Sequence, residues 1–367
     1  MERLNLHLLQ ELQPDWPMGL CGPAGCHFEV GLDAKNVLEA KNKPLWKFLM
    51  VQFFNALRMT FRLKPQFIVA GSGLVAPMVL LAARLVGARA VVYLHGLDVV
   101  AQNAIYQAIW LPCIRRFDLI LVNSHHTRCL ALRKHVPEAK ITILTPGVSI
   151  PIQRTQRGDN FFVNQHGLKN RKLLLSVGRL TPRKGLIQFV SNSLASIAEQ
   201  CPDVLLVHIG GEASEALFGS GNDMQSQIEH AAKVAGVADF VRFIGPVDDA
   251  TLGEAYSAAS VHVFPVLGSE SDVEGFGMVA MEAASHGVPT VAFAVGGVPD
   301  AVDEPISGRL VSANNYGLFS QAVLGLLAEP WGEVEKNHCR AHADGFSWQR
   351  FGKRLRESLS AELCRMP

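Results

Sequence analysis

The sequence predicts an α/β protein built from two doubly wound, Rossmann-like domains that face each other across a cleft. At 367 residues the chain is longer than one hydrophobic core usually supports. Short apolar runs alternate with amphipathic helical runs almost throughout, which is typical of βα units and parallel sheets. The alternation pauses once, over a polar and charged stretch at 151–170, and then restarts. We therefore expect one domain on each side of this linker.

The first predicted domain, residues 1–150, opens with a helix, after which predicted strands and helices alternate. Its apolar runs have the length of buried strands, and the longer runs between them have helical periodicity. We expect helices at 2–12, 44–63, 74–86, 102–116 and 124–135, strands at 66–70, 90–95, 119–123 and 141–144, and apolar pieces near 18–21 and 28–32.

The second predicted domain covers residues 171–345, and residues 346–367 follow it. We expect strands at 173–177, 204–209, 241–244, 261–264 and 290–294, helices at 186–199, 224–235, 251–258 and 278–285, and then a helical tail. Doubly wound sheets bind ligands at the carboxyl ends of their strands. His95, Gly178-Arg179 and Gly210-Gly211 follow such strands, so a ligand site is expected there.

Charge and cysteine content narrow the class of protein. Residues 1–150 carry 16 lysines and arginines against 9 acidic residues, a balance of +7, whereas the remainder carries 18 against 24, a balance of −6. The basic half suits an anionic membrane or a phosphate-bearing acceptor, and a chance surface imbalance is the alternative. Seven cysteines without a Cys-x-x-Cys pair favour reduced thiols in the cytoplasm over a disulfide framework or a zinc site. No signal peptide is expected, and the apolar stretch 71–94 is too interrupted for a membrane span.

The predicted strand 173–177 is followed by a basic loop. Its sequence, GRLTPRKG from Gly178 to Gly185, places Arg179 and Lys184 five positions apart, and Gly185 opens a helix. A guanidinium can bind two phosphate oxygens at once, and a lysine adds a movable positive charge. The loop therefore suits a diphosphate, and a solvated basic turn is the alternative.

A second candidate segment, residues 269–290, carries two carboxylates eight positions apart. Glu274 precedes Gly275-Phe276-Gly277, and Glu282 lies on the helix that follows. Sugar hydroxyls seek carboxylate acceptors, and phosphates bind the unpaired N–H groups and positive dipole at a helix N-terminus. Asp272 and Glu274 also offer a pair of ligands for a hard cation, but two acidic ligands alone favour a hydroxyl acceptor over a metal site.

Together these motifs resemble the retaining glycosyltransferases of family 4, which have the two-domain GT-B fold. The resemblance covers nearly the whole chain. It is carried by Gly178-Arg179 with Lys184-Gly185, by EGFGMVAME at 274–282, GVPT at 287–290 and GGVPD at 296–300, and by HGLD at 95–98, TPGV at 145–148 and FSW at 346–348. In this family the last motif precedes a helix that returns to the first domain, here within residues 346–367.

The resemblance implies a role for each matched residue. Arg179 and Lys184 would bind the donor diphosphate beside Gly178, Glu282 would accept hydrogen bonds from the ribose, and His95 would lie near the reacting centre. The predicted catalytic set is His95, Glu274, Arg179 and Lys184. Glu274 and the backbone at Phe276-Gly277 would hold the transferred sugar, and Phe243 and Gly245 would border the base. The further donor-binding residues are Gly275, Met278 and Val279. No metal and no cofactor is expected other than the nucleotide-diphosphate sugar as co-substrate. The alternatives are a packing role for His95, a surface role for Glu282, and a wedge role for the Phe276 ring.

The expected activity is transfer of a hexose, with retention of configuration, to a glycan or lipid-linked acceptor of the cell envelope. The run TPRKG at 181–185 resembles mannosyltransferases that act on lipid acceptors, which favours GDP-mannose over UDP-glucose or UDP-N-acetylglucosamine. A GT-B epimerase and a non-catalytic donor-binding remnant are the rival interpretations. A dehydrogenase is disfavoured because no Gly-x-Gly-x-x-Gly follows a first strand.

Two further expectations concern the first domain. Family members usually open with a strand and a Gly-Gly loop ahead of a helix like 2–12, so we expect this domain to be truncated at its start, with a consequence for activity. The helix at 43–64 mixes aromatic residues with Lys47, Arg58, Arg62 and Lys64. It suits either an anionic membrane surface or domain packing. We therefore expect a cytoplasmic protein, with peripheral contact to the inner face of a membrane as one option and no nucleic-acid partner.

Overall fold

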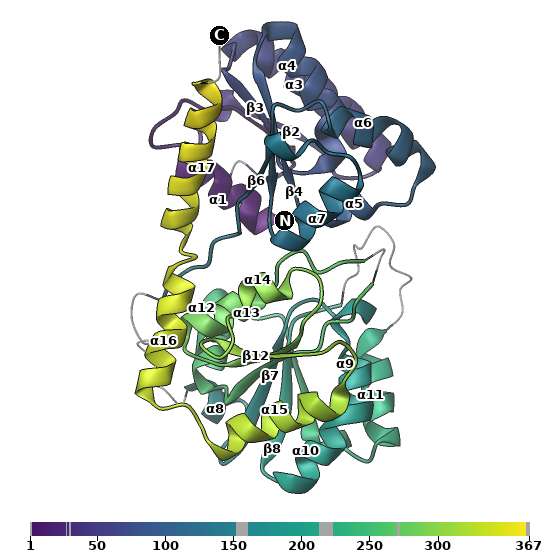
Figure 1. Ribbon diagram of the computed structural model, residues 1–367, viewed down its shortest axis with the longest axis vertical. Helices are drawn as coiled ribbons and strands as arrows, with labels where there is room; N and C mark the ends of the chain where they lie inside the picture. The colour runs from purple at the N-terminus through teal and green to yellow at the C-terminus, as the bar shows by residue number, and fades with distance from the viewer. Residues whose placement is uncertain are drawn as a thin grey trace. The chain divides into compact units, whose positions relative to one another are not determined.

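The computed structural model describes residues 2–26, 28, 31–151, 161–212, 223–269 and 272–364. The chain forms two compact units (Figure 1), the first made of Met1–Gly147 and Trp348–Pro367 and the second of Val148–Ser347. All seven cysteines are free thiols. No helix among the described residues combines the length and the apolar character that a membrane span requires. Every sheet is parallel, and the α/β fold class expected from the sequence is confirmed.

The first unit contains two parallel sheets. Four strands pair in chain order, β3 (Phe67–Ala70), β4 (Arg89–Leu94), β5 (Leu119–Val122) and β6 (Ile141–Ile143), and β1 (Leu20–Pro23) pairs with β2 (Val37–Ala40). β5 is buried along its whole length and β4 over all but its first residue, as expected for central parallel strands covered on both faces. The connecting helices are η1 (Ala34–Asn36), α3 (Leu45–Leu63), η2 (Gly73–Val75), α4 (Ala76–Val86), α5 (Leu97–Val100), η3 (Tyr106–Trp110), α6 (Leu111–Ile114), α7 (His125–Arg133) and η4 (Glu138–Lys140).

The first and last helices of the chain pack together in the first unit (Figure 1). α1 (Glu2–Leu12) buries leucines at every fourth position, and α17 (Trp348–Leu363) buries an apolar stripe that begins at Trp348. The Trp348 ring stacks on His7 with 3.8 Å between ring centroids. A Cβ on Gly147 would lie 2.3 Å from the same ring, so this position needs glycine. These contacts attach α17 to the first unit.

The second unit is built on one six-stranded parallel sheet of order β12-β11-β10-β7-β8-β9. Its strands are β7 (Lys172–Val177), β8 (Val204–Ile209), β9 (Val241–Gly245), β10 (Val261–Phe264), β11 (Thr290–Phe293) and β12 (Gly308–Val311). β8 pairs on one side of β7 and β10 on the other, so β7 lies at the switch point where doubly wound sheets bind ligands.

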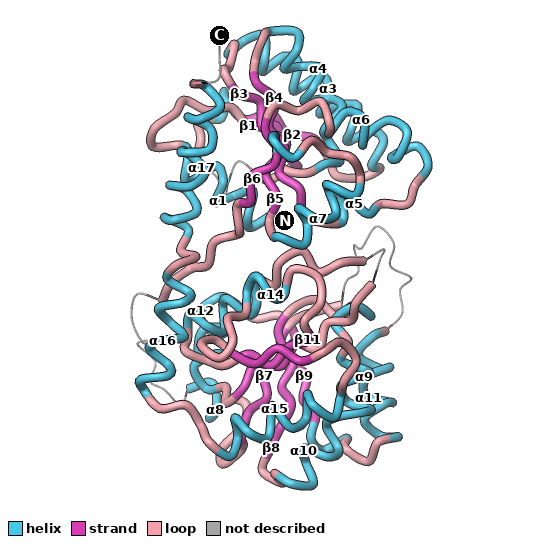
Figure 2. Tube along the Cα trace, in the orientation of Figure 1, coloured by secondary structure: helices cyan, strands magenta, loops and turns pink. Residues whose placement is uncertain are grey.

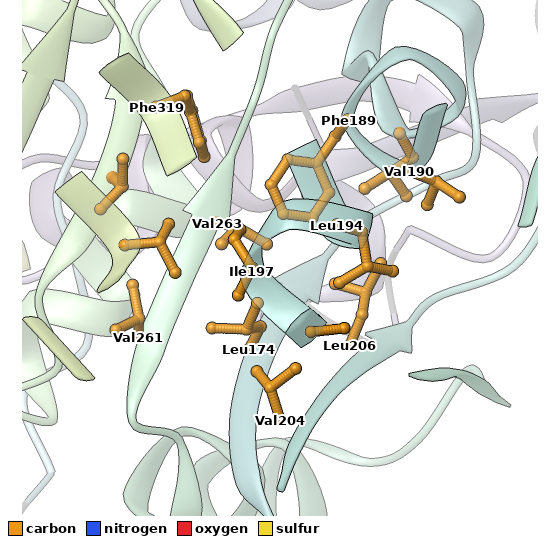
Figure 3. Packing of buried hydrophobic residues seen from close by; sticks show 14 of the residues in the cluster. Leu174, Phe189, Val190, Leu194, Ile197, Val204, Leu206, Val261, Val263 and Phe319 are labelled. Carbon is orange, nitrogen blue, oxygen red and sulfur yellow. The ribbon is translucent and has the colours of Figure 1, made fainter. Parts of the chain in front are cut away.

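Helices flank this sheet on both faces (Figure 2). They are α8 (Phe161–Gln165), η5 (Pro182–Lys184), α9 (Leu186–Phe189), η6 (Val190–Leu194), α10 (Ala195–Gln200), α11 (Met224–Val234), η7 (Ala238–Phe240), α12 (Asp249–Ala258), α13 (Met278–Ser285), α14 (Val298–Ala301), α15 (Tyr316–Ala328) and α16 (Glu333–Asp344). Successive residues of β7 point to opposite sides, Leu174 into one core and Leu173 and Leu175 into the other. In the first of these cores the rings of Phe189 and Phe319 meet at 5.5 Å above the strand side chains (Figure 3).

Several segments differ from the predicted elements, and one of them is the strand β2 (Val37–Ala40), where no element was expected. The expected helical tail contains a further strand, β12, which pairs with β11 at the edge of the sheet. Four residues are too few to show strand periodicity, so the sequence pattern did not reveal it. Part of the expected linker forms α8, whose Phe162 is buried in the second unit's core. The helix expected at 102–116 is shorter, spans residues 104–114 and contains the π-helical turn η3. Residues 152–160 of the linker, and 29–30 of the apolar piece near 28–32, lie outside the described ranges.

Candidate functional site

Glycines hold the basic loop after β7 against neighbouring strand ends. Gly178 and Gly185 have φ angles of 129° and 69°, which residues with a Cβ rarely adopt. A Cβ on Gly210, which follows β8, would lie 2.0 Å from the carbonyl oxygen of Gly178. One on Gly185 would lie 2.0 Å from the carbonyl oxygen of Pro265, which follows β10. The loop is therefore fixed by backbone contact at the switch point of the sheet.

A close contact between Gly275 and Gly297 holds the segment around Glu274 in place. The Gly297 N–H donates to the carbonyl oxygen of Glu274 at 2.8 Å, and a Cβ on Gly297 would lie 2.0 Å from the carbonyl oxygen of Gly275. Gly277, with φ of 98°, is the N-cap residue that directly precedes α13. Within the described chain no side chain caps this helix, so its first N–H groups can bind an anion.

The two loops meet in a cluster of charged side chains, Arg183, Lys184, Asp272 and Glu274, which we call the charge cluster. Lys184 Nζ lies 3.1 Å from Glu274 Oε2, and Arg183 donates to the same oxygen through Nη1. Arg183 Nε lies 3.0 Å from Asp272 Oδ1. The side chains of Arg183, Lys184 and Glu274 are 14% to 17% exposed, so they are partly desolvated but still reachable from solvent.

Burial and the neighbouring opposite charges shift the pKa values of Glu274 and Lys184 in opposite directions. Burial by itself would raise the pKa of Glu274, but the positive charges of Lys184 and Arg183 outweigh it and hold that pKa below its usual value. Burial lowers the pKa of Lys184, Glu274 opposes that effect, and Arg183 and Arg179 add to it. Glu274 is therefore an anion at neutral pH, and its negative charge favours the protonated form of Lys184.

Two buried histidines stand on strands of the same sheet. His208 Nδ1 lies 3.2 Å from Ser176 Oγ, and His262 Nδ1 lies 3.1 Å from Thr290 Oγ1. Burial is the main cause that lowers the pKa of His208 to about 4 and of His262 to about 3, and the charge of Lys184 contributes to both. Both rings are therefore neutral at physiological pH.

The structure brings together only some of the predicted donor residues. Lys184 and Glu274, which are 90 positions apart in the chain, are in contact. Arg179 is exposed and has no hydrogen-bond or ion-pair partner among the described residues, although its charge affects Lys184. The Phe243 ring is partly buried, 5.8 Å from the ring of His208. The carbonyl oxygen of Gly245 accepts from the Gly210 N–H at 3.0 Å.

The residues that follow Glu274 have different surroundings. Phe276 is buried and its ring lies 6.0 Å from that of Phe346, so its backbone rather than its ring is available to a ligand. Met278 and Val279 are partly buried against the same core. Glu282 is half-buried and accepts a hydrogen bond from the Tyr256 hydroxyl at 3.1 Å. Its carboxylate is therefore oriented by the protein, unlike that of a freely solvated surface glutamate.

His95 lies in the first unit, directly after β4. Its Nε2 is 2.8 Å from the carbonyl oxygen of Gly71. Because a carbonyl can only accept, Nε2 carries the proton, and Nδ1 of the neutral ring remains an acceptor. The His95 backbone N–H donates to Asp98 Oδ2 at 2.9 Å. Burial lowers the pKa of His95, which makes it a fixed, neutral imidazole.

The sequence pattern does not single out Arg183 or assign a role to Gly297. Arg183 contacts both carboxylates of the charge cluster. Its position next to Lys184 is the one feature of the sequence that could have pointed to this role. Gly297 belongs to the GGVPD motif, but its contact with Gly275 joins loops that are distant in sequence. No periodicity or spacing rule predicts such a contact.

Two family models match the chain. The family described as glycosyl transferases group 1 matches residues 159–343, and the one described as glycosyltransferase family 4 matches residues 22–150. The first match includes the charge cluster and α13, and the second includes His95.

Several curated proteins are similar to this chain. A GDP-mannose-dependent alpha-(1-6)-phosphatidylinositol monomannoside mannosyltransferase of Mycolicibacterium smegmatis is 30% identical over 311 residues, which cover 78% of this chain and 75% of that protein. A D-inositol 3-phosphate glycosyltransferase of Geodermatophilus obscurus is 37% identical over 180 residues, which cover 48% of this chain and 38% of that protein. A second one, of Catenulispora acidiphila, is 33% identical over 63% of this chain and 53% of its own length. The chain thus spans about half, or less, of the inositol phosphate glycosyltransferases that it matches.

Solved structures share the fold. Anabaena HepE, solved in complex with UDP, has a TM-score of 0.80 and 19% identity, covering 98% of this chain and 96% of that chain. A glycosyltransferase from Rickettsia africae has a TM-score of 0.79 and 16% identity, covering 98% and 93%. At these identities the likeness shows the fold alone. It confirms the expected pair of Rossmann-like domains with the GT-B fold.

Proposed function

This chain belongs to the family 4 glycosyltransferases, and on that premise we propose that it transfers a hexose from a nucleotide-diphosphate sugar to a glycan or lipid-linked acceptor with retention of configuration. The proposed donor is GDP-mannose, ahead of UDP-glucose and UDP-N-acetylglucosamine, because a relative that aligns over 75% of its length is named GDP-mannose-dependent. The proposed location is the cytoplasm, at the inner face of a membrane. The seven free thiols fit a reducing compartment.

The contact between Lys184 and Glu274 is the observation that carries the proposal. It places a cation and a carboxylate from separate loops beside the uncapped start of α13. A nucleotide sugar has the two matching parts, a diphosphate and a hydroxyl-bearing ring. Within the described chain, every hydrogen bond and ion pair of the Glu274 carboxylate reaches Oε2. Oε1 is therefore the oxygen proposed to accept from a sugar hydroxyl.

The cations of the basic loop are proposed to change partner when donor binds. Without donor, Glu274 is the counter-ion of Lys184 and Arg183. The diphosphate would take over part of that role, with Arg179 binding its oxygens as a fork and Lys184 as a point charge. These cations would then stabilise the negative charge that develops on the leaving phosphate.

Retention is proposed to follow from displacement on one face of the sugar. The bond from C1 to the phosphate oxygen breaks while the bond from C1 to the acceptor oxygen forms on the same face. The acceptor's proton passes to the leaving phosphate. In this scheme no protein carboxylate acts as the nucleophile, and Glu274 serves to position the sugar.

The remaining predicted residues are proposed to have supporting roles. Glu282, oriented by Tyr256, would accept from the ribose. The segment from Phe243 to Gly245 would border the base. His95 would offer Nδ1 as an acceptor to a substrate hydroxyl, because its Nε2 is already engaged with Gly71.

The reaction is also proposed to need no metal. Arg183 contacts both nearby carboxylates, Asp272 and Glu274, and Arg179 and Lys184 supply the positive charge that a metal would bring to a diphosphate. We expect the transfer rate to be the same within about twofold with EDTA and with added Mg²⁺. A fall of about tenfold or more in EDTA, reversed by Mg²⁺, would contradict this part of the proposal.

Glu274→Gln tests the proposed site most directly. Glutamine keeps the shape of the side chain but removes the charge, so kcat/KM for transfer should fall by about a hundredfold or more. Affinity for GDP, read from ligand-induced thermal stabilisation, should stay within about threefold because GDP lacks the transferred hexose that residue 274 is proposed to contact. Glu199→Gln, on the exposed side of α10, is the matched control and should leave both quantities unchanged.

The same assays separate the rival functions. Transfer requires an acceptor, whereas an epimerase would convert the donor alone and a binding protein would hold it without turnover. Full transfer activity in Glu274→Gln, donor epimerisation without acceptor, or binding without any turnover would each overturn the proposal.

A further inference from the structure

Arg183 is attached to the segment that carries Glu274 by its main chain as well as by its side chain. The Leu267 N–H donates to the carbonyl oxygen of Arg183 at 2.9 Å. In the side chain, Nη1 donates to Glu274 Oε2, and Nε forms an ion pair with Asp272 Oδ1 at 3.0 Å. Leu267, Asp272 and Glu274 all lie between β10 and α13. Arg183 therefore contacts this segment through three groups without any ligand.

Lys184 contacts the same carboxylate in a way that a ligand can replace. Its Nζ lies 3.1 Å from Glu274 Oε2 and 4.7 Å from the centre of the Phe264 ring. An ammonium is a point charge on a flexible stem, so it can turn to a phosphate oxygen by rotation of its side chain. A guanidinium that is paired with two carboxylates would have to give up both ion pairs to do so. Lys184 is therefore the cation that can move to a diphosphate, and Arg183 is the one that stays.

This difference matters for Glu274 once a donor is bound. The Glu274 side chain is 14% exposed, and burial by itself would raise the pKa of its carboxyl, an effect that the charges of Lys184 and Arg183 oppose. When Lys184 turns to the diphosphate, the phosphate charges compensate its ammonium, and its effect on Glu274 weakens. A largely buried carboxylate without a counter-ion takes up a proton. Arg183 is then the cation that keeps Glu274 ionised.

We propose that Arg183 is a positioning residue, which holds the Glu274 carboxylate in place for the transferred sugar while Asp272 holds Arg183 from the other side. Its contact with Oε2 turns Oε1 toward a sugar hydroxyl. The inference rests on the proposed function, because it assumes that Glu274 binds the hexose of a nucleotide-diphosphate sugar. Asp272 is 49% exposed, so we expect its contribution to be the smaller one.

Two ligands of equal charge isolate the contribution of the hexose. GDP-mannose and the β-methyl ester of GDP carry the same diphosphate charge, but only GDP-mannose has a sugar for Glu274 to bind. We call the ratio of their dissociation constants, measured by titration calorimetry of the full chain, the sugar advantage. The unchanged chain should show a sugar advantage of about tenfold or more, constant between about pH 5.5 and 8, because the pKa of Glu274 is below its usual value. UDP-glucose and the β-methyl ester of UDP form the second arm, for the alternative donor.

Arg183→Gln should make the sugar advantage depend on pH. Without the guanidinium, burial raises the pKa of Glu274, and a proton neutralises the carboxylate at the lower pH. The sugar advantage should fall to about threefold or less at about pH 5.5, as in Glu274→Gln, and should increase at least about threefold at about pH 8. A residue that only stabilises the fold would change the affinity for both ligands equally and would leave the ratio unchanged at every pH.

The other titratable groups near Glu274 do not imitate this behaviour. Lys184 is proposed to bind the diphosphate of both ligands, so its titration cancels in the ratio. His208 on β8 and His262 on β10 are affected by the charge of Lys184, and their pKa values of about 4 and about 3 leave both rings neutral in the range measured. Asp272, in the same segment as Glu274, is tested by a variant of its own.

Two conservative variants separate charge from geometry. Arg183→Lys keeps a cation, so the sugar advantage should stay constant with pH, but it should be about threefold lower because lysine lacks the planar fork. Asp272→Asn removes a negative charge together with the outer partner of Arg183. It should lower the sugar advantage by about threefold or less, without further loss at the lower pH.

Two controls mark the limits of the effect. Arg179→Gln should weaken both ligands by about tenfold and leave the sugar advantage unchanged, because Arg179 is proposed to bind the diphosphate that both ligands share. Lys233→Gln, on the exposed side of α11, should change neither affinity. Calorimetry is performed well below the unfolding midpoint of each variant. A crystal structure of the unchanged chain with GDP-mannose bound adds a measurement that does not depend on the folding of any variant.

Each outcome decides the inference. Loss of the sugar advantage at the lower pH in Arg183→Gln but not in Arg183→Lys supports it, as does a donor complex in which Lys184 contacts the diphosphate and Arg183 still contacts Glu274. It is overturned if Arg183→Gln keeps the sugar advantage of the unchanged chain, if it loses that advantage equally at both pH values, or if Arg183 contacts the diphosphate in the donor complex. A sugar advantage without transfer to any acceptor would refute the proposed transfer and leave this inference standing. If the unchanged chain shows no sugar advantage for either donor, the proposed role of Glu274 fails, and this inference fails with it.

Discussion

At the scale of single residues, Arg179 and Arg183 belong to one loop but have different surroundings. Arg183 contacts Asp272 and Glu274, whereas Arg179 is exposed and has no partner among the described residues. We expect Arg183→Gln to lower the free energy of unfolding by about 1–3 kcal/mol, because it removes one partner of a largely buried charge group. Chemical denaturation of the full chain measures this change.

Arg179→Gln is the matched control for that experiment. Its unfolding free energy should stay within about 0.5 kcal/mol of the unchanged chain, since exposed charges contribute little to stability. Its affinity for GDP should nevertheless fall by about tenfold, because the proposed site loses its forked phosphate contact. Equal destabilisation by the two substitutions would contradict the division of roles.

The buried histidines predict how stability depends on pH. The pKa of His262 is lowered to about 3, so as pH falls from neutral the unfolded chain binds a proton at this position before the folded chain does. Stability is therefore complete above about pH 6.5 and decreases toward pH 3, by at most about 1.4 kcal/mol per pH unit for each such group. Glu274, whose pKa is also lowered, adds a loss below its unfolded value near pH 4.5.

His262→Gln should flatten this acid dependence while it keeps a polar group beside Thr290. The measurement is the free energy of unfolding at several pH values between 7 and about 4, compared with the unchanged chain. The difference between the two proteins should shrink as pH falls, since the variant has no histidine to protonate. A difference that is the same at every pH would mean that His262 is not buried and neutral as described.

At the scale of elements, the loop that contains Gly297 fixes the position of the Glu274 segment. A Cβ here would lie 2.0 Å from the carbonyl oxygen of Gly275, so Gly297→Ala must displace one of the two loops. We expect a loss of about 2 kcal/mol or more in unfolding free energy, together with weaker donor binding.

Gly325→Ala provides the contrast within the same unit. Gly325 lies inside α15, and a Cβ there meets nothing within 4 Å. Alanine favours helix over glycine by about 1 kcal/mol, so this substitution should be neutral or stabilising and should leave donor binding unchanged. If both glycines respond alike in a thermal unfolding assay, the close approach at Gly297 is not what holds the loop.

The polarity of α3 shows what a sequence pattern can and cannot predict about an element. The spacing of apolar residues predicts the helix and its amphipathic character, but two opposite faces share the same period. Whether Trp46 or Gln52 faces the core depends on tertiary contacts, here the hydrogen bonds that Asn55 and Arg62 donate to backbone carbonyl oxygens outside the helix. For this reason the sequence left open whether the helix packs within its domain or presents an apolar surface.

At the scale of the whole molecule, both units could be predicted because buried parallel strands and amphipathic helices have clear periods. β12 was not predicted, since it is short and lies at the edge of the sheet. Lys184 and Glu274 could be selected from chemistry and spacing, and the structure brings them into contact. The ion pairs of Arg183 with Asp272 and Glu274 could not be predicted, because they depend on how two loops that are distant in sequence fold together.

The glycine contacts also limit how this protein can be altered. At Gly185, Gly210 and Gly297 one stretch of main chain touches another with no room for a side chain between them. Random mutagenesis aimed at a new sugar preference would yield mostly inactive clones at these three codons. Productive diversity should instead be sought at positions such as Asp272 and Val279, where side chains remain partly open to solvent and the main-chain scaffold is untouched.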